Sequence, residues 1–234
     1  MVKTLGIIGG MGPLATVQMF ENIVLNTDAG CDQEHIPILI YNNSKIIDRT
    51  DYILGKTSTS PKEELIKSAK KLEDMGADFL VMSCNTAHYF YEDIIENIDI
   101  PFLNMIEETA KYILENTDQK KVGIFATEGT IQTKIYHNMF EKYGMEIVTP
   151  SKENQKYITD MIYGIKHGES LDSIDGFKKA KKELEDKGVD IFIAACTEIS
   201  LAIDLYNLPG EIFDPMEILA LKAIDFAGKK QKIR

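Results

Sequence analysis

Apolar runs of strand length alternate with helical patterns along the whole chain. The runs are continuous and rich in Ile, Val, Leu and Phe, which is typical of strands buried on both faces of a parallel sheet. One amphipathic segment starts at Ser60 and Pro61 with Glu63 in its first turn, which predicts a helix that runs to Asp74 and ends before Gly76. This alternation predicts an α/β fold with crossover helices. The expected strands are residues 3–9, 37–41, 79–83, 121–125 and 191–196.

The chain contains two copies of one sequence pattern. LEDMGADFLVMSC (72–84) aligns without a gap with LEDKGVDIFIAAC (184–196), 112 residues later, and six of the thirteen positions are identical. KTLGIIGGMGP (3–13) aligns with KKVGIFATEGT (120–130), and LNMIEETA (103–110) aligns with FDPMEILA (213–220), at spacings of 117 and 110. Three pairs in the same order predict two α/β units related by a pseudo-twofold axis. We expect one unit to comprise residues 1–103 with 214–234, and the other residues 104–213.

The chain is acidic, with 37 Asp and Glu against 26 Lys and Arg and a formal net charge of −11. A surface of this sign argues against a duplex nucleic-acid partner, and a site for an anion must be built locally. The apolar stretches are too short to span a membrane, and the N-terminal segment lacks the apolar core of a signal peptide. Three scattered cysteines are too few for a disulfide framework, so we expect a reduced, cytoplasmic protein.

Each repeat places a cysteine at the end of a buried strand, in CNTAH from Cys84 and in CTEIS from Cys196. Open α/β sheets bind ligands at the carboxyl ends of their strands, and a helix N-terminus behind each cysteine favours a thiolate. A single cysteine there is usually a small buried hydrophobe. Because two cysteines occupy equivalent positions in the two repeats, a functional role is favoured over simple burial. Two thiols facing each other across a cleft can remove a proton from one face of a carbon and return one to the other, which inverts a stereocentre.

These motifs resemble those of the aspartate/glutamate racemase superfamily, through GGMGP near the start, CNTAH in the first half and ACTEI in the second. Glu198 stands where glutamate racemases usually carry a histidine, which makes the chain similar to the aspartate racemase branch. The resemblance covers nearly the whole chain. It implies two flavodoxin-like domains with the active site in the cleft between them. It also implies a racemase that uses no pyridoxal phosphate or other cofactor, with Cys84 and Cys196 as the catalytic pair.

The resemblance further implies two cations that hold the carboxylates of an acidic amino acid, aspartate or glutamate. Arg49 follows the second strand and is the only arginine inside the chain, and Lys166 lies in an expected helical segment of the second half. A guanidinium can bind a carboxylate through two parallel hydrogen bonds. The other expected substrate-binding residues lie at strand ends: Met11, Asn43, Asn85, Thr86, Thr127, Thr130, Thr197 and Glu198.

Two alternatives stay open. A maleate isomerase or malonate decarboxylase of the same superfamily would share the fold and the cysteines, and a non-catalytic carboxylate-binding protein would share the bilobal scaffold. Cys84 and His88 are four residues apart and could suit zinc, but the sequence offers no third and fourth ligand, so we expect no metal. GGMGP lacks the G-x-G-x-x-G spacing of a dinucleotide loop. We expect a homodimer that binds neither nucleic acid nor a membrane.

Overall fold

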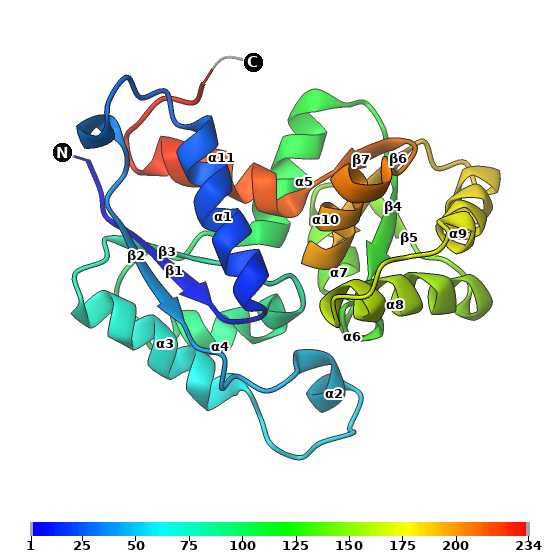
Figure 1. Ribbon diagram of the computed structural model, residues 1–234, viewed down its shortest axis with the longest axis horizontal. Coiled ribbons are helices and arrows are strands. Elements are labelled where there is room, and N and C mark those ends of the chain that lie inside the picture. Colours follow the sequence, from blue (N-terminus) through cyan, green and yellow to red (C-terminus); the bar gives the residue numbers. More distant parts are fainter. Residues whose placement is uncertain (1, 233–234) are drawn as a thin grey trace.

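The computed structural model describes residues 2–232, the side chain of Asp204 excepted, and contains two parallel sheets (Figure 1). The first has the order β2-β1-β3, and a parallel bridge from Leu80 to Phe102 extends it by one position. The second has the order β5-β4-β6-β7. Counting the bridge, both halves show the same flavodoxin-like order. The strands are β1 (Leu5–Gly9), β2 (Ile38–Asn42), β3 (Phe79–Met82), β4 (Lys121–Ala126), β5 (Glu146–Val148), β6 (Ile191–Ala195) and β7 (Glu211–Phe213).

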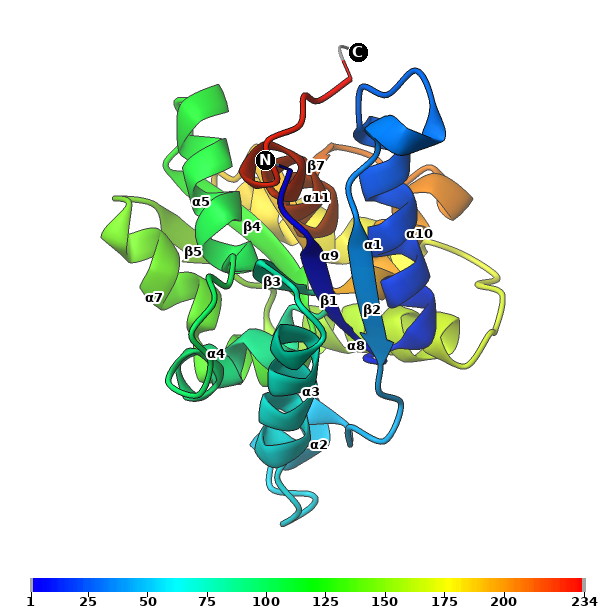
Figure 2. The same cartoon turned by 90° about the vertical axis from the view of Figure 1, so that its left-hand side faces the viewer.

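Helices cover both faces of each sheet (Figures 1 and 2). The first sheet packs α1 and α11 on one face and α3 on the other, and the second packs α8, α9 and α10 on one face and α5 and α7 on the other. The helices are α1 (Pro13–Asn26), η1 (Asp32–Glu34), α2 (Arg49–Ile53), α3 (Lys62–Asp74), η2 (Thr86–Phe90), α4 (Tyr91–Ile95), α5 (Met105–Asn116), α6 (Glu128–Thr133), α7 (Ile135–Lys142), α8 (Lys152–Lys166), α9 (Asp175–Asp186), α10 (Thr197–Tyr206) and α11 (Pro215–Phe226).

The sequence repeat is also a repeat of packing. Gly6 of β1 pairs with Leu80 of β3, and Gly123 of β4 pairs with Phe192 of β6. A Cβ on Gly6 would lie 2.5 Å from the Leu80 side chain, and a Cβ on Gly123 would lie 2.6 Å from the Phe192 ring. Both distances are too short for carbon atoms in contact. Each glycine therefore makes room for a large side chain on the neighbouring strand, at the same place in both halves.

The two halves exchange their last helices. α5 follows the Phe102 bridge of the first sheet, yet its residues Ala110 and Ile113 pack in a core with the second sheet. α11 follows β7 of the second sheet, yet its residues Leu219 and Ala223 pack in a core with the first sheet. The chain therefore passes between the sheets twice, and each passage leads into a helix.

At both places where the chain passes between the sheets, a polar side chain caps the helix that follows. Asn104 caps α5 by accepting the backbone N–H groups of Ile106 and Glu107, and Asp214 caps α11 by accepting that of Met216. On this basis we propose the division into residues 1–103 with 214–234 and residues 104–213, of which residues 1, 233 and 234 lie outside the described part.

The expected α/β fold and its five long strands are confirmed, each within about two residues of the expected bounds. The helix expected up to Asp74 is α3, and Gly76 after it has a φ of +94°. The sequence pattern misses β5 and β7, which are three residues long and lie at the two edges of their sheet. After Cys84 a five-residue 3₁₀ helix stands where we expected an α-helix. Across residues 2–232, every helix is too short or too polar to cross a bilayer.

Candidate active site

One small cavity lies where the two halves meet, beyond the carboxyl ends of β1, β3, β4 and β6. Its volume is about 20 Å³. The structure brings ten of the twelve expected site residues together in its lining, and adds Asp48 and Thr50. The lining consists of Met11, Asp48, Arg49, Thr50, Cys84, Asn85, Thr86, Thr127, Lys166, Cys196, Thr197 and Glu198.

Cys196 has a carboxylate as its nearest partner. It is the N-cap residue of α10, and its thiol donates a hydrogen bond to Glu198 Oε2 at 2.8 Å. The Thr197 hydroxyl donates to the same oxygen at 3.1 Å, and all three residues are buried. Burial, and after it the negative charge of Glu198, raises the pKa of Cys196 well above its ordinary value. Cys196 is therefore held as a neutral thiol.

Cys84 follows β3 at the equivalent point and has a cation beside it. Arg49 begins α2 and is only 7% exposed, and its Nη1 donates to the Ile47 carbonyl at 2.9 Å. Burial acts to lower the pKa of Arg49, but the charges of Cys84 and Asp48 outweigh burial and raise it. The Arg49 Nε is buried and has no hydrogen-bond partner among residues 2–232. The guanidinium therefore keeps one donor for a ligand.

A second cation reaches the cavity from the other half. Lys166 ends α8, and its Nζ lies 3.1 Å from Asp48 Oδ2. Asp48 also caps α2 by accepting the backbone N–H of Asp51. Burial acts to lower the pKa of Lys166, but the charges of Asp48 and Glu198 raise it; burial acts to raise the pKa of Asp48, but Lys166 and Arg49 lower it. Both side chains are just under one third exposed, so this ion pair joins the two halves at the mouth of the cavity.

Asn85 is oriented from the other half as well. Its Oδ1 accepts a hydrogen bond from the Tyr136 hydroxyl on α7. Tyr136 is fully buried, and burial raises its pKa well above the ordinary value, so its hydroxyl stays protonated and able to donate. With the amide oxygen engaged in this way, the amide nitrogen is the group with which Asn85 can bind a carboxylate.

The hydroxyls of Thr86, Thr127 and Thr130 form a closed triangle between the two halves. The oxygen–oxygen distances are 3.1 Å from Thr86 to Thr127, 2.9 Å from Thr86 to Thr130 and 3.1 Å from Thr127 to Thr130. Each hydroxyl has one hydrogen to donate, so three contacts use all three hydrogens. While the triangle is closed, these hydroxyls join the halves and have no hydrogen for a substrate carboxylate.

Two expected residues do not line the cavity. Thr130 lies behind Thr86 in the triangle, and the Asn43 side chain donates to Glu64 Oε2 at 3.1 Å and to Ser68 Oγ at 3.2 Å, both on α3. A Cβ on Gly10, whose φ is +94°, would lie 2.4 Å from the Asn43 carbonyl group. Asn43 therefore anchors the end of β2 on α3 and packs against the turn after β1, which a strand-end position alone does not reveal.

His88 is occupied by backbone groups, which disfavours the zinc alternative. Its Nδ1 lies 2.8 Å from the Cys84 carbonyl oxygen, and the Met105 N–H donates to its Nε2 at 3.1 Å. Nε2 is thus the acceptor, and Nδ1 carries the hydrogen. Burial lowers the pKa of His88 to about 4, so the ring is neutral. His88 connects the backbone of Cys84 with the start of α5.

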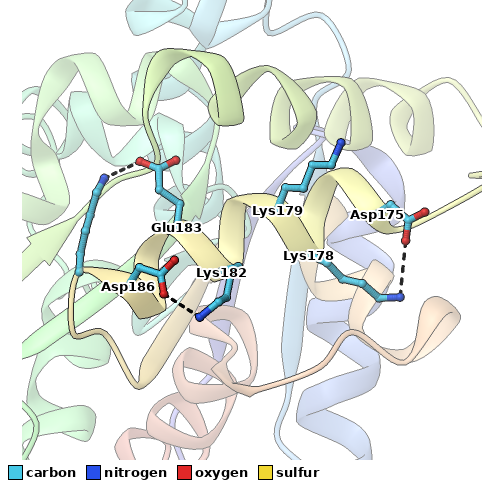
Figure 3. Close-up of a pocket in the computed structure, with 7 residues that line it drawn as sticks. Asp175, Lys178, Lys179, Lys182, Glu183 and Asp186 are labelled. Atoms are coloured by element: carbon cyan, nitrogen blue, oxygen red, sulfur yellow. Dashed lines mark hydrogen bonds and ion pairs between the residues drawn. The ribbon is translucent and has the colours of Figure 1, made fainter.

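A larger hollow, of about 800 Å³, lies on the outer surface of α9 (Figure 3). Two of its lysines pair with acidic residues of the same helix, Lys178 with Asp175 at 3.6 Å and Lys182 with Asp186 at 2.6 Å. Exposed pairs at these helical spacings contribute a few tenths of a kcal/mol, about as much as they do on an isolated helix. The hollow is therefore a solvated helix face.

Sequence reasoning misses three residues of this region. Asp48 could have been found from the sequence, because an aspartate is a typical N-cap residue, and its carboxylate accepts the N–H of Asp51 three residues later. Thr50 packs close to α6, where a Cβ on Gly129 would lie 3.0 Å from the Thr50 Cα. Tyr136 could not have been found, because an aromatic residue on the apolar face of a helix is usually an ordinary core residue.

Two parallel α/β units that meet at one cavity, each with a cysteine at the same strand end, give this chain the fold of a solved aspartate racemase. The chain belongs to the Asp/Glu/hydantoin racemase family, whose sequence model matches residues 8–223. It is therefore an isomerase of the racemase class, and its match with the structure of an aspartate racemase is consistent with the aspartate racemase branch.

Three relatives illustrate the range of this family. The structure of an aspartate racemase from Picrophilus torridus is 31% identical with a TM-score of 0.85, and the match covers 98% of this chain and 96% of that one. A broad specificity amino-acid racemase of Bacillus subtilis is 28% identical over 231 residues, 94% of this chain and 96% of the relative. A glutamate racemase of Bacillus anthracis, 16% identical with a TM-score of 0.70, shares the fold and covers 97% and 82% of the two chains.

Proposed function

We propose that this chain racemises an acidic amino acid, aspartate first and glutamate second, by two-base proton transfer at Cα. One observation carries the proposal: Cys84 and Cys196 line the same cavity from the two halves and have neighbours of opposite charge. Arg49 places a positive charge beside Cys84, and burial together with Glu198 keeps Cys196 as a thiol. At its start, the reaction needs one base and one acid on opposite sides of Cα.

In one direction the Cys84 thiolate removes the α-proton, and the Cys196 thiol donates its proton to the opposite face of Cα. Cys84 ends as a thiol and Cys196 as a thiolate, so the opposite enantiomer meets the reversed pair. Two thiolates would repel each other across the cavity, so the titration belongs to the pair. Arg49 and the amide nitrogen of Asn85 are donors for the charge that develops on the α-carboxylate.

The charges of the cavity fit a zwitterionic dicarboxylate. Arg49 and Lys166 are partners for the two carboxylates, and Asp48 and Glu198 are partners for the ammonium group. The match with an aspartate racemase over nearly the whole chain supports aspartate, and the broad specificity of the Bacillus subtilis relative is a reason to test glutamate as well. Membership of a racemase family favours an enzyme over the non-catalytic alternative.

The cleft must open before the substrate can enter. A cavity of about 20 Å³ has room for about one water molecule, whereas aspartate has nine non-hydrogen atoms. Opening separates Lys166 from Asp48 and Thr86 from Thr127 and Thr130. Closure over the substrate would exclude water and strengthen each electrostatic contact in the cavity.

The test is incubation in D₂O with each enantiomer of aspartate and glutamate, followed by chiral chromatography and NMR at Cα. We expect the opposite enantiomer to form with deuterium at Cα, with no pyridoxal absorbance and with activity that survives dialysis against chelators. Turnover of maleate or malonate with no racemisation would favour the alternative enzymes. Activity that is lost on dialysis and restored by zinc would favour the metal alternative.

The two cysteines can be tested separately. We expect Cys84→Ser and Cys196→Ser each to abolish racemisation, and each to keep α-proton exchange for one enantiomer because one thiol remains. Cys31→Ser is the matched control, since Cys31 is exposed, and its activity should equal that of the unchanged chain. Full racemisation by either of the first two variants would refute the two-thiol mechanism.

A further inference from the structure

The residue four positions after each cysteine lies beside a passage of the chain between the two halves. In the repeat, His88 of the first half corresponds to Ser200 of the second. The repeat also makes Asn104 correspond to Asp214, and these two residues cap the helices that follow the passages, α5 and α11. In both halves the repeat therefore places a polar residue after the cysteine and a polar cap at the passage.

In the first half the His88 ring forms a bridge between the cysteine and the passage. Its Nδ1–H donates to the Cys84 carbonyl oxygen at 2.8 Å, and its Nε2 accepts the N–H of Met105, the first residue of α5, at 3.1 Å. The backbone N–H of His88 donates to the Asn85 carbonyl, as the 3₁₀ geometry of η2 requires. The ring, rather than this N–H, therefore holds the Cys84 carbonyl, and it is only 4% exposed.

In the second half an equivalent bridge is built from other atoms. Ser200 donates its backbone N–H to the Cys196 carbonyl at 3.2 Å and its hydroxyl to Asp214 Oδ1 at 2.8 Å. Pro215, which corresponds to Met105 in the repeat, has no N–H to donate. The contact with the passage therefore moves from the first residue of the helix to its cap. Ser200 is only 3% exposed.

The two bridges differ in side chain, donor and acceptor, yet each joins a cysteine carbonyl to the start of the helix after a passage. The turn after each cysteine also carries lining residues of the cavity, Asn85 and Thr86 in one half and Thr197 and Glu198 in the other. Residues at the ends of such elements take up the backbone changes when two halves of a protein move. A bridge from the passage can therefore hold the turn, and with it the thiol, during such a motion.

We propose that His88 and Ser200 are positioning residues, which keep Cys84 and Cys196 at fixed places relative to the two passages while the cleft opens and closes. The proposal rests on the proposed two-thiol racemisation and adds no chemical step to it. A displacement of about 1 Å at a reacting group can cost about 100-fold in rate, so loss of a bridge should lower kcat. In the proposed function the substrate carboxylates bind cations that neither bridge contacts, so KM should change little.

The first test breaks one end of a bridge at a time. By the positions of their amide groups, His88→Asn keeps a donor for the Cys84 carbonyl and loses the acceptor for Met105, whereas His88→Gln does the reverse. Ser200→Ala loses the hydrogen bond to Asp214. We expect each variant to lower kcat for aspartate by about tenfold to about 100-fold, while KM stays within about threefold.

Thr109→Val is the matched control. The Thr109 hydroxyl is fully buried and donates to the Met105 carbonyl at 2.7 Å, so its loss also removes a buried hydrogen bond at the start of α5. This bond does not lead to a cysteine. We expect kcat of Thr109→Val to equal that of the unchanged chain, even where urea unfolding shows the same loss of stability as in the His88 variants.

The two bridges can be tested separately by α-proton exchange in chains with one catalytic thiol. In the Cys196→Ser chain the remaining base is Cys84, so His88→Asn should slow exchange at least about tenfold more than Ser200→Ala does. In the Cys84→Ser chain the order of the two effects should be reversed. General damage to the fold would slow exchange equally in both chains.

Exchange of backbone amides with D₂O gives a readout that does not depend on activity. We expect faster exchange at residues 85–88 in His88→Asn and at residues 197–200 in Ser200→Ala. The proposal is overturned if kcat of the bridge variants stays within about threefold of Thr109→Val, if only KM changes, or if both one-thiol chains respond equally. If the unchanged chain racemises neither aspartate nor glutamate, the proposed function fails. Amide exchange then decides about the bridges, which unchanged exchange in both variants would overturn.

Discussion

Replacement of Arg49 by alanine removes the one buried guanidinium of the cavity. In the present arrangement this side chain stands beside Cys84 and Asp48 and donates to the Ile47 carbonyl. In the proposed mechanism its loss leaves Cys84 and the substrate carboxylate without their cation, and breaking such a buried charge pair costs about 2–5 kcal/mol. At about 1.36 kcal/mol per tenfold, kcat/KM for aspartate should fall between about 30-fold and about 5,000-fold.

Arg49→Lys should recover only part of this loss, because an ammonium group cannot form the planar pair of hydrogen bonds that a guanidinium forms. The assay is kcat/KM for each enantiomer of aspartate by chiral chromatography. Lys56→Ala is the matched control, since Lys56 pairs with Asp51 of α2 at the exposed surface, where the pair is worth little. A fall of less than threefold for Arg49→Ala would refute its assignment to the substrate carboxylate.

Three further changes test other contacts. Glu198→Gln removes the negative charge beside Cys196 and should lower the pKa of that thiol. In a variant whose only cysteine is Cys196, the pH dependence of the alkylation rate should therefore shift to lower pH. Gly129→Ala adds a Cβ 3.0 Å from the Thr50 Cα where α6 meets α2, and should lower kcat/KM about tenfold by hindering closure. Asp214 has a pKa that burial raises to about 6, so the native state binds its proton more tightly than the unfolded chain. The buried, protonated Asp214 therefore adds its full stabilisation to the free energy of unfolding below about pH 4. This stabilisation falls by at most about 3 kcal/mol as the pH rises through 6. Asp214→Asn keeps the acceptor for Ser200 and Met216 and should flatten this dependence in urea unfolding.

Each of these expectations has a control. Alkylation of Cys196 that stays in place or moves to higher pH in Glu198→Gln would show that Glu198 does not set its protonation. Gly164→Ala on α8 has no atom closer than 3.5 Å to the new Cβ, so it should leave kcat/KM unchanged. Equal losses in both glycine variants would contradict the closure argument. An unchanged pH dependence in Asp214→Asn would assign that dependence to other groups.

The fold could be predicted because its signals are local and repeated. Buried strands such as β4 and β6 are continuous apolar runs, and the gap-free match of residues 72–84 with 184–196 fixes both cysteines at the same strand end. β5 and β7 escape prediction because a three-residue strand is too short for a periodic pattern and depends on its neighbour for stability. Among the residues selected by their strand-end position, Asn85 and Thr197 line the cavity, whereas the Asn43 side chain turns to α3.

Contacts between the halves are the part that sequence does not reveal. The Asp48–Lys166 pair joins residues 118 apart, and the Tyr136–Asn85 hydrogen bond joins residues 51 apart. Neither pair shares a helix or a strand, so no periodicity links them. The same holds for the cation beside Cys84, because Arg49 reaches the cavity from α2.

The exchange of α5 and α11 has a mechanical consequence. The chain crosses between the sheets twice, once before Asn104 and once before Asp214, and the helices that begin there pack against each other. Two domains joined by one chain connection can rotate in any direction, whereas two connections leave rotation about the line between them as the easiest motion. Sliding and twisting of one half against the other would strain both connections. We therefore expect the proposed opening of the cleft to be a rotation about this line, which would return Cys84 and Cys196 to the same separation each time the cleft closes.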